Sequence, residues 1–368
     1  MQDIVLILTN SIGGLYNFRQ EVIKSLIEAN YHVVISAPRN KKIQCFLEMG
    51  CEYIETPFKI KGTNPWQDIK LLFRYKKIIK RLKPLAVLTY TIKPNIYGGI
   101  ACKWCKVFQI ANITGLGTAV EKEGWMQKVT IFLYRIGMSK THLIFFQNQA
   151  NLNFFQDKGI LKGKKMLIPG SGVNIQHHSF QQYPTDNIIR FLFIGRIQKE
   201  KGIDQYLEAA EILRKRFPFL EFHIVGSCYG HYAQRVDEYN QKGVIIYHGQ
   251  QIDVRPYYKM ANCTISPSYY PEGMSNVLLE SCAAGRPIIT TNRPGCGEVV
   301  DDGVNGFLVR QEDTTDLVHQ IEKFIHLSYE EKRQMGLNAR KKVEQEFNRE
   351  IVVNAYLKAV DDVRYHNA

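Results

Sequence analysis

Two carboxylates, separated by seven residues, lie at the ends of the segment 272–280 (EGMSNVLLE), where a polar loop passes into a predicted helix. Paired carboxylates serve as general acid and base, and carboxylates also accept hydrogen bonds from hydroxyl-rich ligands. A glycoside hydrolase needs its two carboxyl groups on either side of one scissile bond. Because a loop and the start of a helix separate Glu272 from Glu280, contacts to two parts of one long ligand are the better interpretation.

A basic motif lies upstream at 195–202 (GRIQKEKG), directly after the apolar run 191–194 (FLFI). The run predicts a strand, so Arg196 and Lys201 lie on the turn that leads to the next helix. Isolated surface cations are the ordinary alternative, but the flanking glycines favour close approach of a phosphate. Two such cations would neutralise a pyrophosphate without a metal. The sequence contains no Asp-x-Asp pair, and we therefore expect no metal.

Two glycine-containing loops in the first half are weaker candidates. Residues 9–14 (TNSIGG) follow a predicted strand and precede a helix, so their N–H groups are able to approach a phosphate, although a plain tight turn explains them almost as well. Residues 115–120 (GLGTAV) begin like a dinucleotide fingerprint, but Val120 replaces the third glycine and no acidic residue follows at the required distance. We do not expect nicotinamide binding.

A regular alternation of short apolar runs and amphipathic stretches must position these segments. Seven runs of the first half predict strands at 4–9, 32–37, 52–55, 86–90, 108–113, 142–147 and 166–168. Helical stretches lie between most of them, among them 16–29, 67–82 and 127–139. This alternation predicts a parallel sheet covered by helices on both faces.

The pattern restarts in the second half. Strands are expected at 190–194, 219–225, 244–248, 263–266, 288–291 and 306–309, and helices at 203–216 and 276–284. Residues 181–187 (QQYPTDN) are polar and contain a proline, which is typical of a linker. The expected fold class is α/β, with two Rossmann-like doubly wound domains that face each other across a cleft and bind a ligand at the strand C-termini.

The net charge of +13 lies entirely in the first half. Residues 1–180 contain 25 Lys/Arg and 10 Asp/Glu, a balance of +15, whereas residues 181–368 carry −2. Part of the excess lies at 70–83 (KLLFRYKKIIKRLK), where a solvated helix face is the ordinary explanation. Over the half-chain, attraction to an anionic membrane surface explains the charge better. Nucleic acid is the rival partner, but no nucleic-acid-binding motif supports it.

The sequence also indicates a compartment. No apolar run is long enough for a transmembrane helix, and the N-terminus lacks a signal-peptide pattern, so we expect a cytoplasmic protein. The eight cysteines are scattered rather than spaced as a framework, which favours free thiols. Cys102 and Cys105 have the C-x-x-C spacing, but no second pair completes four zinc ligands.

A family resemblance emerges from the segments 195–202 and 272–280 together with 267–268 (PS) and 283–291 (AAGRPIITT). Their combination resembles the nucleotide-sugar-binding domain of retaining glycosyltransferases of family 4, which have the GT-B fold. The resemblance covers about residues 188–310. It implies an N-terminal, acceptor-binding, membrane-facing domain at 1–180, a donor-binding domain at 188–345, and a last helix at 346–368 that returns to the first domain.

A narrower resemblance is carried by four segments of the first half: 16–19 (YNFR), 90–98 (YTIKPNIYG), 112–117 (NITGLG) and 169–174 (PGSGVN). They are similar to bacterial enzymes that extend undecaprenyl-pyrophosphate-linked oligosaccharides for capsule or O-antigen. This implies a peripheral enzyme on the inner face of the cell membrane. It would transfer a hexose or N-acetylhexosamine, from a UDP-linked donor, to a lipid-linked saccharide with retention and without metal or other cofactor.

The resemblance implies roles for individual residues. Arg196 and Lys201 would hold the donor pyrophosphate, which gains charge as it leaves. Glu272 would contact the hydroxyls of the donor sugar, and Glu280 those of the ribose. Further donor contacts would come from Gly14, Gly195, Gly273, Met274, Ser275 and Asn276. Ser275 is also expected to cap the helix that carries Glu280.

The acceptor side is less defined. Arg19 and Lys93 are the candidates for contact with the acceptor phosphates, because of their motifs and charge. Several relatives carry a histidine or an acidic residue just before the Gly-Leu-Gly loop, where this chain has Thr114. Thr114 would supply a hydrogen bond to the acceptor or sugar, and no residue is assigned as nucleophile or base.

Two alternatives from other classes stay open. A nucleotide-sugar isomerase or epimerase of the same fold would turn over the donor without an acceptor. A non-catalytic nucleotide-binding protein would keep its biological activity after Glu272→Gln or Lys201→Ala.

Overall fold

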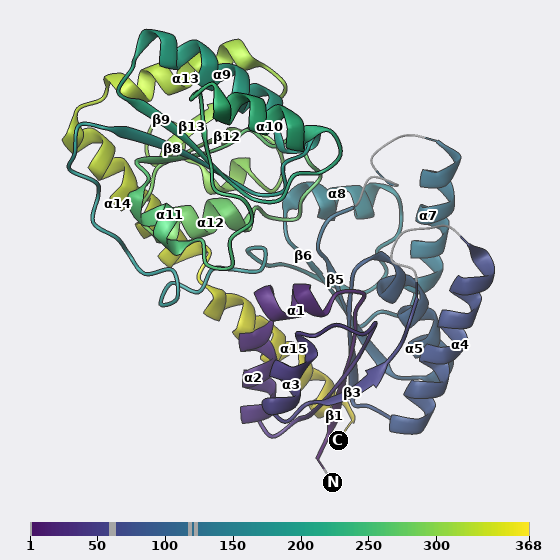
Figure 1. Cartoon of the computed structure of the whole chain (residues 1–368). Helices are drawn as coiled ribbons and strands as arrows, with labels where there is room; N and C mark the ends of the chain where they lie inside the picture. The colour runs from purple at the N-terminus through teal and green to yellow at the C-terminus, as the bar shows by residue number, and fades with distance from the viewer. Residues whose placement is uncertain (1, 59–63, 117–119, 121–123, 368) are drawn as a thin grey trace. The chain divides into compact units, whose positions relative to one another are not determined.

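A computed structural model describes the chain at residues 2–58, 64–116, 120 and 124–367. Its contacts divide the chain into two compact units. Unit 1 consists of Met1–Ser171 with Glu350–Ala368, and unit 2 consists of Gly172–Arg349. In each unit, helices cover both faces of a parallel sheet (Figure 1).

The described part of unit 1 has a seven-stranded sheet in the order β3-β2-β1-β4-β5-β6-β7, with every neighbouring pair parallel. Its strands are β1 (Ile4–Leu8), β2 (His32–Ala37), β3 (Glu52–Glu55), β4 (Ala86–Tyr90), β5 (Phe108–Ile113), β6 (Leu143–Phe146) and β7 (Lys164–Leu167). The inner strands are apolar runs because helices bury both of their faces. The strand order reverses between β1 and β4.

One face of this sheet is covered by α1 (Ile12–Phe18), α2 (Gln20–Glu28), α3 (Ile43–Glu48) and α15 (Arg349–Asn367). The other face is covered by α4 (Pro65–Leu82), α5 (Gly99–Cys105), α7 (Trp125–Gly137) and α8 (Gln149–Asp157), with the π-helical turn η1 (Pro94–Gly98). The C-terminal helix thus completes the core of unit 1, where Val352, Tyr356 and Val360 are buried.

The single helix expected at 16–29 is two helices. They meet at Arg19, which ends α1 and begins α2 with a non-helical φ of −138°. The bend turns the Arg19 side chain inward, and it is only 3% exposed.

Unit 2 has a six-stranded parallel sheet in the order β10-β9-β8-β11-β12-β13. Its strands are β8 (Ile189–Ile194), β9 (Leu220–Val225), β10 (Ile246–Tyr247), β11 (Cys263–Ser266), β12 (Ile288–Thr291) and β13 (Gly306–Val309). The strand order reverses between β8 and β11, as it does between β1 and β4 in unit 1. The expected α/β fold class, with two doubly wound domains in series, is therefore confirmed.

The helices of unit 2 form two layers. One layer contains α9 (Ile203–Arg216), α10 (Tyr232–Gln241) and α13 (Thr314–His326). The other contains α11 (Arg255–Met260), α12 (Asn276–Ala283) and α14 (Tyr329–Glu346). Short 3₁₀ turns lie at η2 (Lys199–Lys201) and η3 (Gly297–Val299).

The expected linker at 181–187 lies inside unit 2, and the chain passes between the units at 171/172 and 349/350. The segment is fixed because the Arg286 guanidinium donates hydrogen bonds to the carbonyls of Gln181 (2.9 Å) and Gln182 (2.7 Å). In addition, the Tyr183 hydroxyl donates to the carbonyl of Asn262 at 3.0 Å. A polar, proline-containing stretch is here a packed part of the domain.

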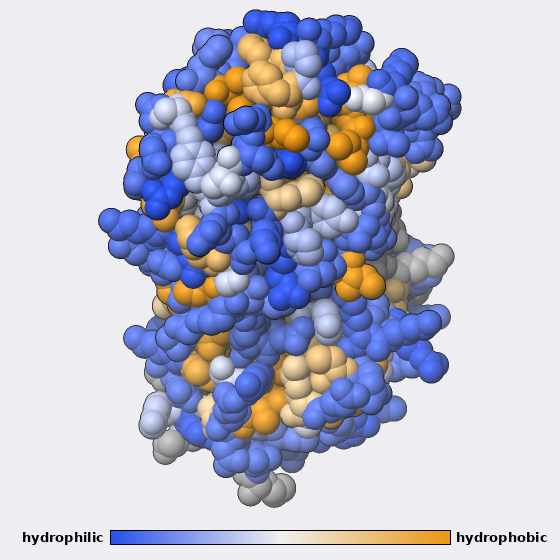
Figure 2. All heavy atoms as spheres, turned by 60° about the vertical axis from the view of Figure 1, so that its left-hand side comes forward, coloured by the Kyte–Doolittle hydropathy of each residue, from blue (hydrophilic) through white to orange (hydrophobic). Residues whose placement is uncertain are grey.

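On the face of the chain drawn in Figure 2, hydrophilic residues predominate and hydrophobic residues form small separate groups. Among the described residues, no helix combines the length and the apolar character needed to cross a bilayer. All eight cysteines are free thiols.

Candidate functional site

The reversal of strand order in unit 2 brings two loops together at the C-terminal edge of its sheet. β8 and β11 are hydrogen-bonded neighbours, so the loops that follow them begin side by side. The loop after β8 carries Arg196 and Lys201, and the loop after β11 carries Tyr270 and Glu272. Open α/β sheets bind their ligands where such loops diverge.

The two loops are held against each other by backbone contacts. The amide of Tyr269 donates to the carbonyl of Glu200 at 2.9 Å. Gly202 has a φ of +74°, and a Cβ there would lie 2.1 Å from the carbonyl oxygen of Pro267. Only glycine fits this position, which explains the glycine that ends the basic motif.

The contact between the two loops brings Lys201 of the basic motif next to Glu272 of the segment 272–280. The Lys201 ammonium forms an ion pair with Oε1 of Glu272, and their side chains are 17% and 15% exposed. The sequence predicted both residues as ligand contacts but not their direct pairing, which depends on the packing of loops 71 residues apart. Arg196, by contrast, is exposed on its turn next to Gly195, whose φ is +148°.

Tyr270 joins the two cations and was missed by the sequence reasoning. The Arg196 guanidinium carbon lies 5.1 Å from the centre of the Tyr270 ring, and the Lys201 ammonium lies 5.2 Å from it. Cations at such distances are attracted by the ring quadrupole. Two positive charges are thereby kept on one ring, and one of them, Lys201, is also paired with Glu272. The Tyr-Tyr pair that precedes Glu272 was the available signal.

The segment that follows Glu272 leads into the N-terminus of α12. Ser275 is the residue before the helix, as expected, but its side chain makes no capping hydrogen bond, so that prediction is wrong. The backbone amide of Ser275 instead donates to the carbonyl of Gly295 at 2.7 Å. A Cβ at Gly295 would lie 3.0 Å from the carbonyl oxygens of Glu272 and Gly273, so the loop after β12 braces this segment.

Two further residues of this segment differ in their surroundings. Met274 is buried in the apolar cluster around α12 and α14, so its side chain serves the core. Asn276 has a buried Oδ1 with no hydrogen-bond partner among the described residues. A buried polar atom without a partner is costly. The Asn276 amide is therefore the group of this segment that most needs a ligand or water as partner.

Glu280 lies one helix turn further on, in a different environment from Glu272. The Tyr258 hydroxyl donates to Oε2 of Glu280 at 3.0 Å, and the ring nitrogen Nε2 of His178 lies 4.0 Å from Oε1. Burial raises the pKa of Glu280 to about 7, against smaller lowering effects of Tyr258 and Arg349. Burial also lowers the pKa of His178 to about 4, so this imidazole is neutral near pH 7.

Gly14 and Lys93, two of the predicted contact residues of unit 1, already form polar contacts within the protein. The Gly14 amide, expected to approach a pyrophosphate, donates to the Ser11 hydroxyl at 2.9 Å as part of the cap of α1. The Lys93 ammonium forms an ion pair of 2.7 Å with Asp68, whose other oxygen accepts from the Tyr97 hydroxyl at 3.0 Å. A phosphate bound at Lys93 therefore competes with Asp68 for the ammonium group.

Arg19 is buried rather than presented to solvent. Its guanidinium carbon lies 5.5 Å from the centre of the Tyr90 ring and 5.7 Å from that of Tyr356, and Nη1 donates to the carbonyl of Phe18. Its Nε has no hydrogen-bond partner among the described residues. Thr114 is half-buried at the end of β5, and Gly117 of the same loop lies outside the described residues.

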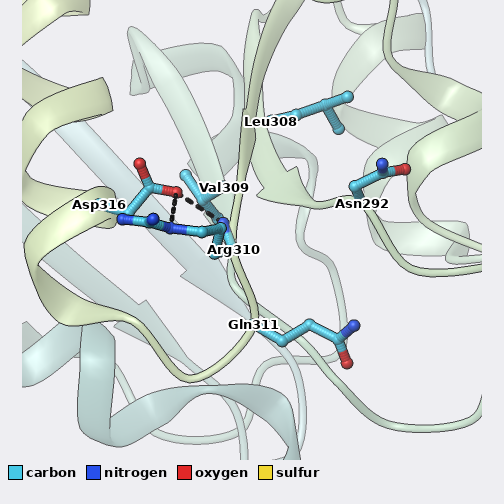
Figure 3. A pocket seen from close by; sticks show the side chains of 6 residues that line it. All are labelled: Asn292, Leu308, Val309, Arg310, Gln311 and Asp316. Atoms are coloured by element: carbon cyan, nitrogen blue, oxygen red, sulfur yellow. Dashed lines mark hydrogen bonds and ion pairs between the residues drawn. The ribbon is translucent and has the colours of Figure 1, made fainter.

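A shallow polar cavity of about 330 Å³ lies at the C-terminal ends of β12 and β13. Figure 3 shows its lining: Asn292, Leu308, Val309, Arg310, Gln311 and Asp316. Arg310 is tied to Asp316 by its backbone amide at 2.7 Å and by its side chain at 3.6 Å. None of the predicted donor contacts lines this cavity, and its own cation is already paired.

In the described part of the chain, no group of three or more His, Cys, Asp or Glu side chains is arranged so that it could hold a metal ion. The arrangement at the edge of unit 2 offers instead two cations on an aromatic ring, a carboxylate beside one of them, and a second carboxylate in the first turns of α12. This set suits a ligand with a diphosphate and hydroxyl groups at both ends.

Family models match both halves of the chain. Residues 5–148 match the model described as glycosyl transferase 4-like, and residues 175–342 match that of glycosyl transferases group 1. The first match covers the strands of unit 1 from β1 to β6. The second covers the sheet of unit 2 and every predicted donor contact in it.

Two curated relatives are similar over most of their length. The N,N'-diacetylbacillosaminyl-diphospho-undecaprenol alpha-1,3-N-acetylgalactosaminyltransferase of Campylobacter jejuni is 24% identical, over 97% of this chain and 98% of its own. The capsular polysaccharide biosynthesis glycosyltransferase CapM of Staphylococcus aureus is 26% identical, over 78% and 79%.

Solved structures share the fold. A glycosyltransferase from Rickettsia africae superimposes with a TM-score of 0.81 at 19% identity, over 98% of both chains. Anabaena HepE in complex with UDP superimposes with a TM-score of 0.79 at 16% identity, over 98% of this chain and all of its own. Together with the two doubly wound sheets, these matches establish the GT-B fold.

Proposed function

The chain belongs to the glycosyltransferases, and we propose that it moves a sugar from a nucleotide donor to a polyprenyl-diphosphate-linked saccharide in bacterial surface polysaccharide synthesis. The acceptor class is supported by the Campylobacter relative, whose name gives an undecaprenyl-diphosphate-linked substrate. The process is supported by CapM, a protein of capsule synthesis. The observation that carries the proposal is the pairing of Arg196 and Lys201 on Tyr270 beside Glu272.

In the proposed reaction, Arg196 and Lys201 bind the donor diphosphate. Lys201 leaves Glu272 for a phosphate oxygen, and the freed carboxylate accepts hydrogen bonds from the sugar hydroxyls. The bond between the anomeric carbon and the diphosphate then breaks, and the bonding electron pair stays on the phosphate oxygen. Fixed cations stabilise that developing charge and thereby lower the barrier. No metal is required in this scheme.

The acceptor hydroxyl attacks the anomeric carbon from the side on which the diphosphate leaves. Its proton passes to the departing phosphate oxygen, so the products are a new glycosidic bond and a nucleoside diphosphate. The configuration of the sugar is retained in this scheme. The assignment to family 4 is supported by the match of residues 5–148 to the glycosyl transferase 4-like model. Glu280 accepts hydrogen bonds from the ribose at the other end of the donor.

A UDP-linked hexose or N-acetylhexosamine is the proposed donor. Anabaena HepE is solved with UDP and with UDP-glucose, and the Campylobacter relative is named for transfer of N-acetylgalactosamine. Gly14, Arg19, Lys93 and Thr114 are proposed to face the acceptor and the diphosphate from unit 1. Lys93 takes this role by exchanging Asp68 for a phosphate.

The test is a transfer assay with purified protein, a panel of nucleotide sugars and a polyprenyl-diphosphate-linked disaccharide, with products identified by mass. One donor is expected to give a glycosidic product and a nucleoside diphosphate, and NMR of the product is expected to show the donor's anomeric configuration. Absence of product with every donor contradicts the proposal. Conversion of the donor without an acceptor identifies an isomerase instead.

A further inference from the structure

Eight large apolar side chains are exposed on three helices that cover one face of the unit 1 sheet. Trp66 is 75% exposed on α4 and Trp125 is 71% exposed on α7. The complete set, which we call the aromatic surface, is Trp66, Ile69, Phe73, Trp104, Trp125, Met126, Val129 and Phe132. Large exposed apolar patches on a protein mark an interaction site.

The helical spacing shows that this surface is separate from the core. On α4, Leu71, Tyr75 and Ile78 are buried against the sheet, whereas Trp66, Ile69 and Phe73 point away from it at i, i+3 and i+7. On α7 the buried residues include Ile131 and Tyr134, and the exposed ones recur at 125, 126, 129 and 132. Each helix therefore has a second apolar stripe that the described chain does not cover.

The stripes lie on helices that pack together. The Phe73 and Trp104 rings are 6.2 Å apart, which joins α4 to α5. α5 contacts α7 as well, and the three helices lie on the same side of unit 1 in Figure 1. The Lys76 ammonium lies 5.0 Å from the centre of the Trp104 ring, so a cation borders the aromatic side chains directly.

The described helices that carry the aromatic surface are strongly basic. The described segments 64–82, 99–106 and 124–137 contain a single acidic residue, Asp68, which is paired with Lys93. The same segments contain ten basic residues: Lys70, Arg74, Lys76, Lys77, Lys80, Arg81, Lys103, Lys106, Lys128 and Arg135. These segments thus carry +9 of the net +15 of the first half.

We propose that the aromatic surface docks unit 1 on an anionic lipid bilayer. Tryptophan and phenylalanine insert at the level of the lipid headgroups, and lysine and arginine bind the anionic headgroups around them. A protein partner fits less well, because the centres of protein interfaces are depleted in lysine. The inference rests on the proposed function in one respect: a polyprenyl-linked acceptor lies in a membrane.

Flotation of the full-length protein with vesicles tests the proposal. Binding is expected to phosphatidylcholine vesicles that contain phosphatidylglycerol, and to weaken when salt rises from about 0.05 to about 0.5 M. The fourfold variant Trp66→Ser, Phe73→Ser, Trp125→Ser, Phe132→Ser is expected to bind at least about tenfold more weakly. Its matched control, Phe219→Ser with Tyr365→Ser, removes exposed aromatic residues elsewhere and is expected to bind like the wild type.

A charge variant separates the basic contribution. Lys70→Gln, Lys77→Gln, Lys103→Gln and Lys128→Gln together are expected to weaken binding to anionic vesicles about tenfold at low salt and to reduce its salt dependence. Replacement of the exposed lysines 158, 162, 164 and 165 by Gln also removes four positive charges, but away from the aromatic surface. This control is expected to retain most of the binding.

Three results overturn the proposal. The first is that the wild type does not bind anionic vesicles, and the second is that the aromatic variant binds them as well as the wild type. The third is that each control variant loses as much vesicle binding as the variant it is compared with. Self-association that needs the aromatic surface, without vesicle binding, identifies a second copy of the chain as its partner instead.

Activity on a water-soluble acceptor with a short prenyl chain separates this inference from the proposed function. The aromatic variant is expected to keep wild-type transfer on that acceptor, which also shows that it is folded. Vesicle binding without any transfer leaves the docking surface intact and refutes the proposed function. Transfer without vesicle binding supports the proposed function and refutes the docking surface.

Discussion

Tyr258 and Glu280 are joined by a hydrogen bond of 3.0 Å in which the phenol donates to the carboxylate. The bond lowers the pKa of Glu280, but burial raises it more, and the pKa lies at about 7. Ionisation of Glu280 is therefore poorly tolerated by the fold, although we propose that the ionised form binds the ribose.

This pKa predicts a pH dependence of stability. Because the folded protein holds the proton up to about pH 7 and the unfolded chain releases it near 4.5, stability from this group falls as pH rises between these values. The Glu280→Gln variant lacks this loss. We expect the difference in free energy of unfolding between wild type and variant to change by up to about 3 kcal/mol between pH 4.5 and 8. Urea denaturation followed by circular dichroism measures it, and parallel pH profiles would contradict the assignment.

The proposed role of Lys201 predicts a specific loss in turnover. Lys201→Ala removes a cation from the departing diphosphate, and kcat/KM is expected to fall about 10²- to 10³-fold, mostly in kcat. Lys199→Ala is the matched control, because Lys199 lies exposed on the same turn η2. It is expected to stay within about twofold of the wild type. Equal kinetics of the two variants would remove Lys201 from the mechanism.

Two substitutions of Tyr270 are expected to differ in their affinity for UDP. Tyr270→Phe keeps the ring under Arg196 and Lys201, and its affinity for UDP is expected to match the wild type. Tyr270→Ala removes the ring, and the affinity is expected to fall about 2- to 30-fold, as expected from a cation–π interaction of about 0.5 to 2 kcal/mol. Calorimetric titration with UDP measures both. An equal loss in the two variants would assign the effect to the hydroxyl instead.

Replacement of Arg286 is expected to reduce the stability of the protein rather than to act on catalysis. It is fully buried and donates to five carbonyls: those of Gln181, Gln182, Tyr258, Lys259 and Gly285. Arg286→Ala leaves these acceptors without a donor and is expected to lower the free energy of unfolding by about 3 to 5 kcal/mol. Arg333→Ala, an exposed arginine with one surface ion pair, is expected to cost less than about 1 kcal/mol. Similar losses in both would contradict this interpretation.

The sequence predicted the sheets closely. The strands β2, β4, β5 and β12 coincide with the expected segments residue for residue. Strands buried on both faces are continuous apolar runs bounded by polar turns, and this pattern is local. The helix α9 was predicted equally well, because its caps and its apolar stripe lie within one stretch.

The sequence did not predict how side chains from distant loops meet. The pairing of Lys201 with Glu272 and the position of Tyr270 depend on β8 and β11 being neighbours, which the strand order decides. Charge was a poor guide to exposure as well. Arg19 was proposed from its charge as a ligand contact, and its guanidinium is buried beside the rings of Tyr90 and Tyr356, the latter from the far end of the chain.

Unit 2 begins and ends at neighbouring points of its own surface. The Val173 amide donates to the carbonyl of Phe347 at 2.8 Å, and the Arg349 amide donates to the carbonyl of Val173 at 3.0 Å. The chain therefore enters and leaves this unit side by side, as in a domain inserted into a host. A cut of the chain at these two adjacent junctions would release the whole of unit 2 and leave unit 1 with α15, and therefore with its complete core.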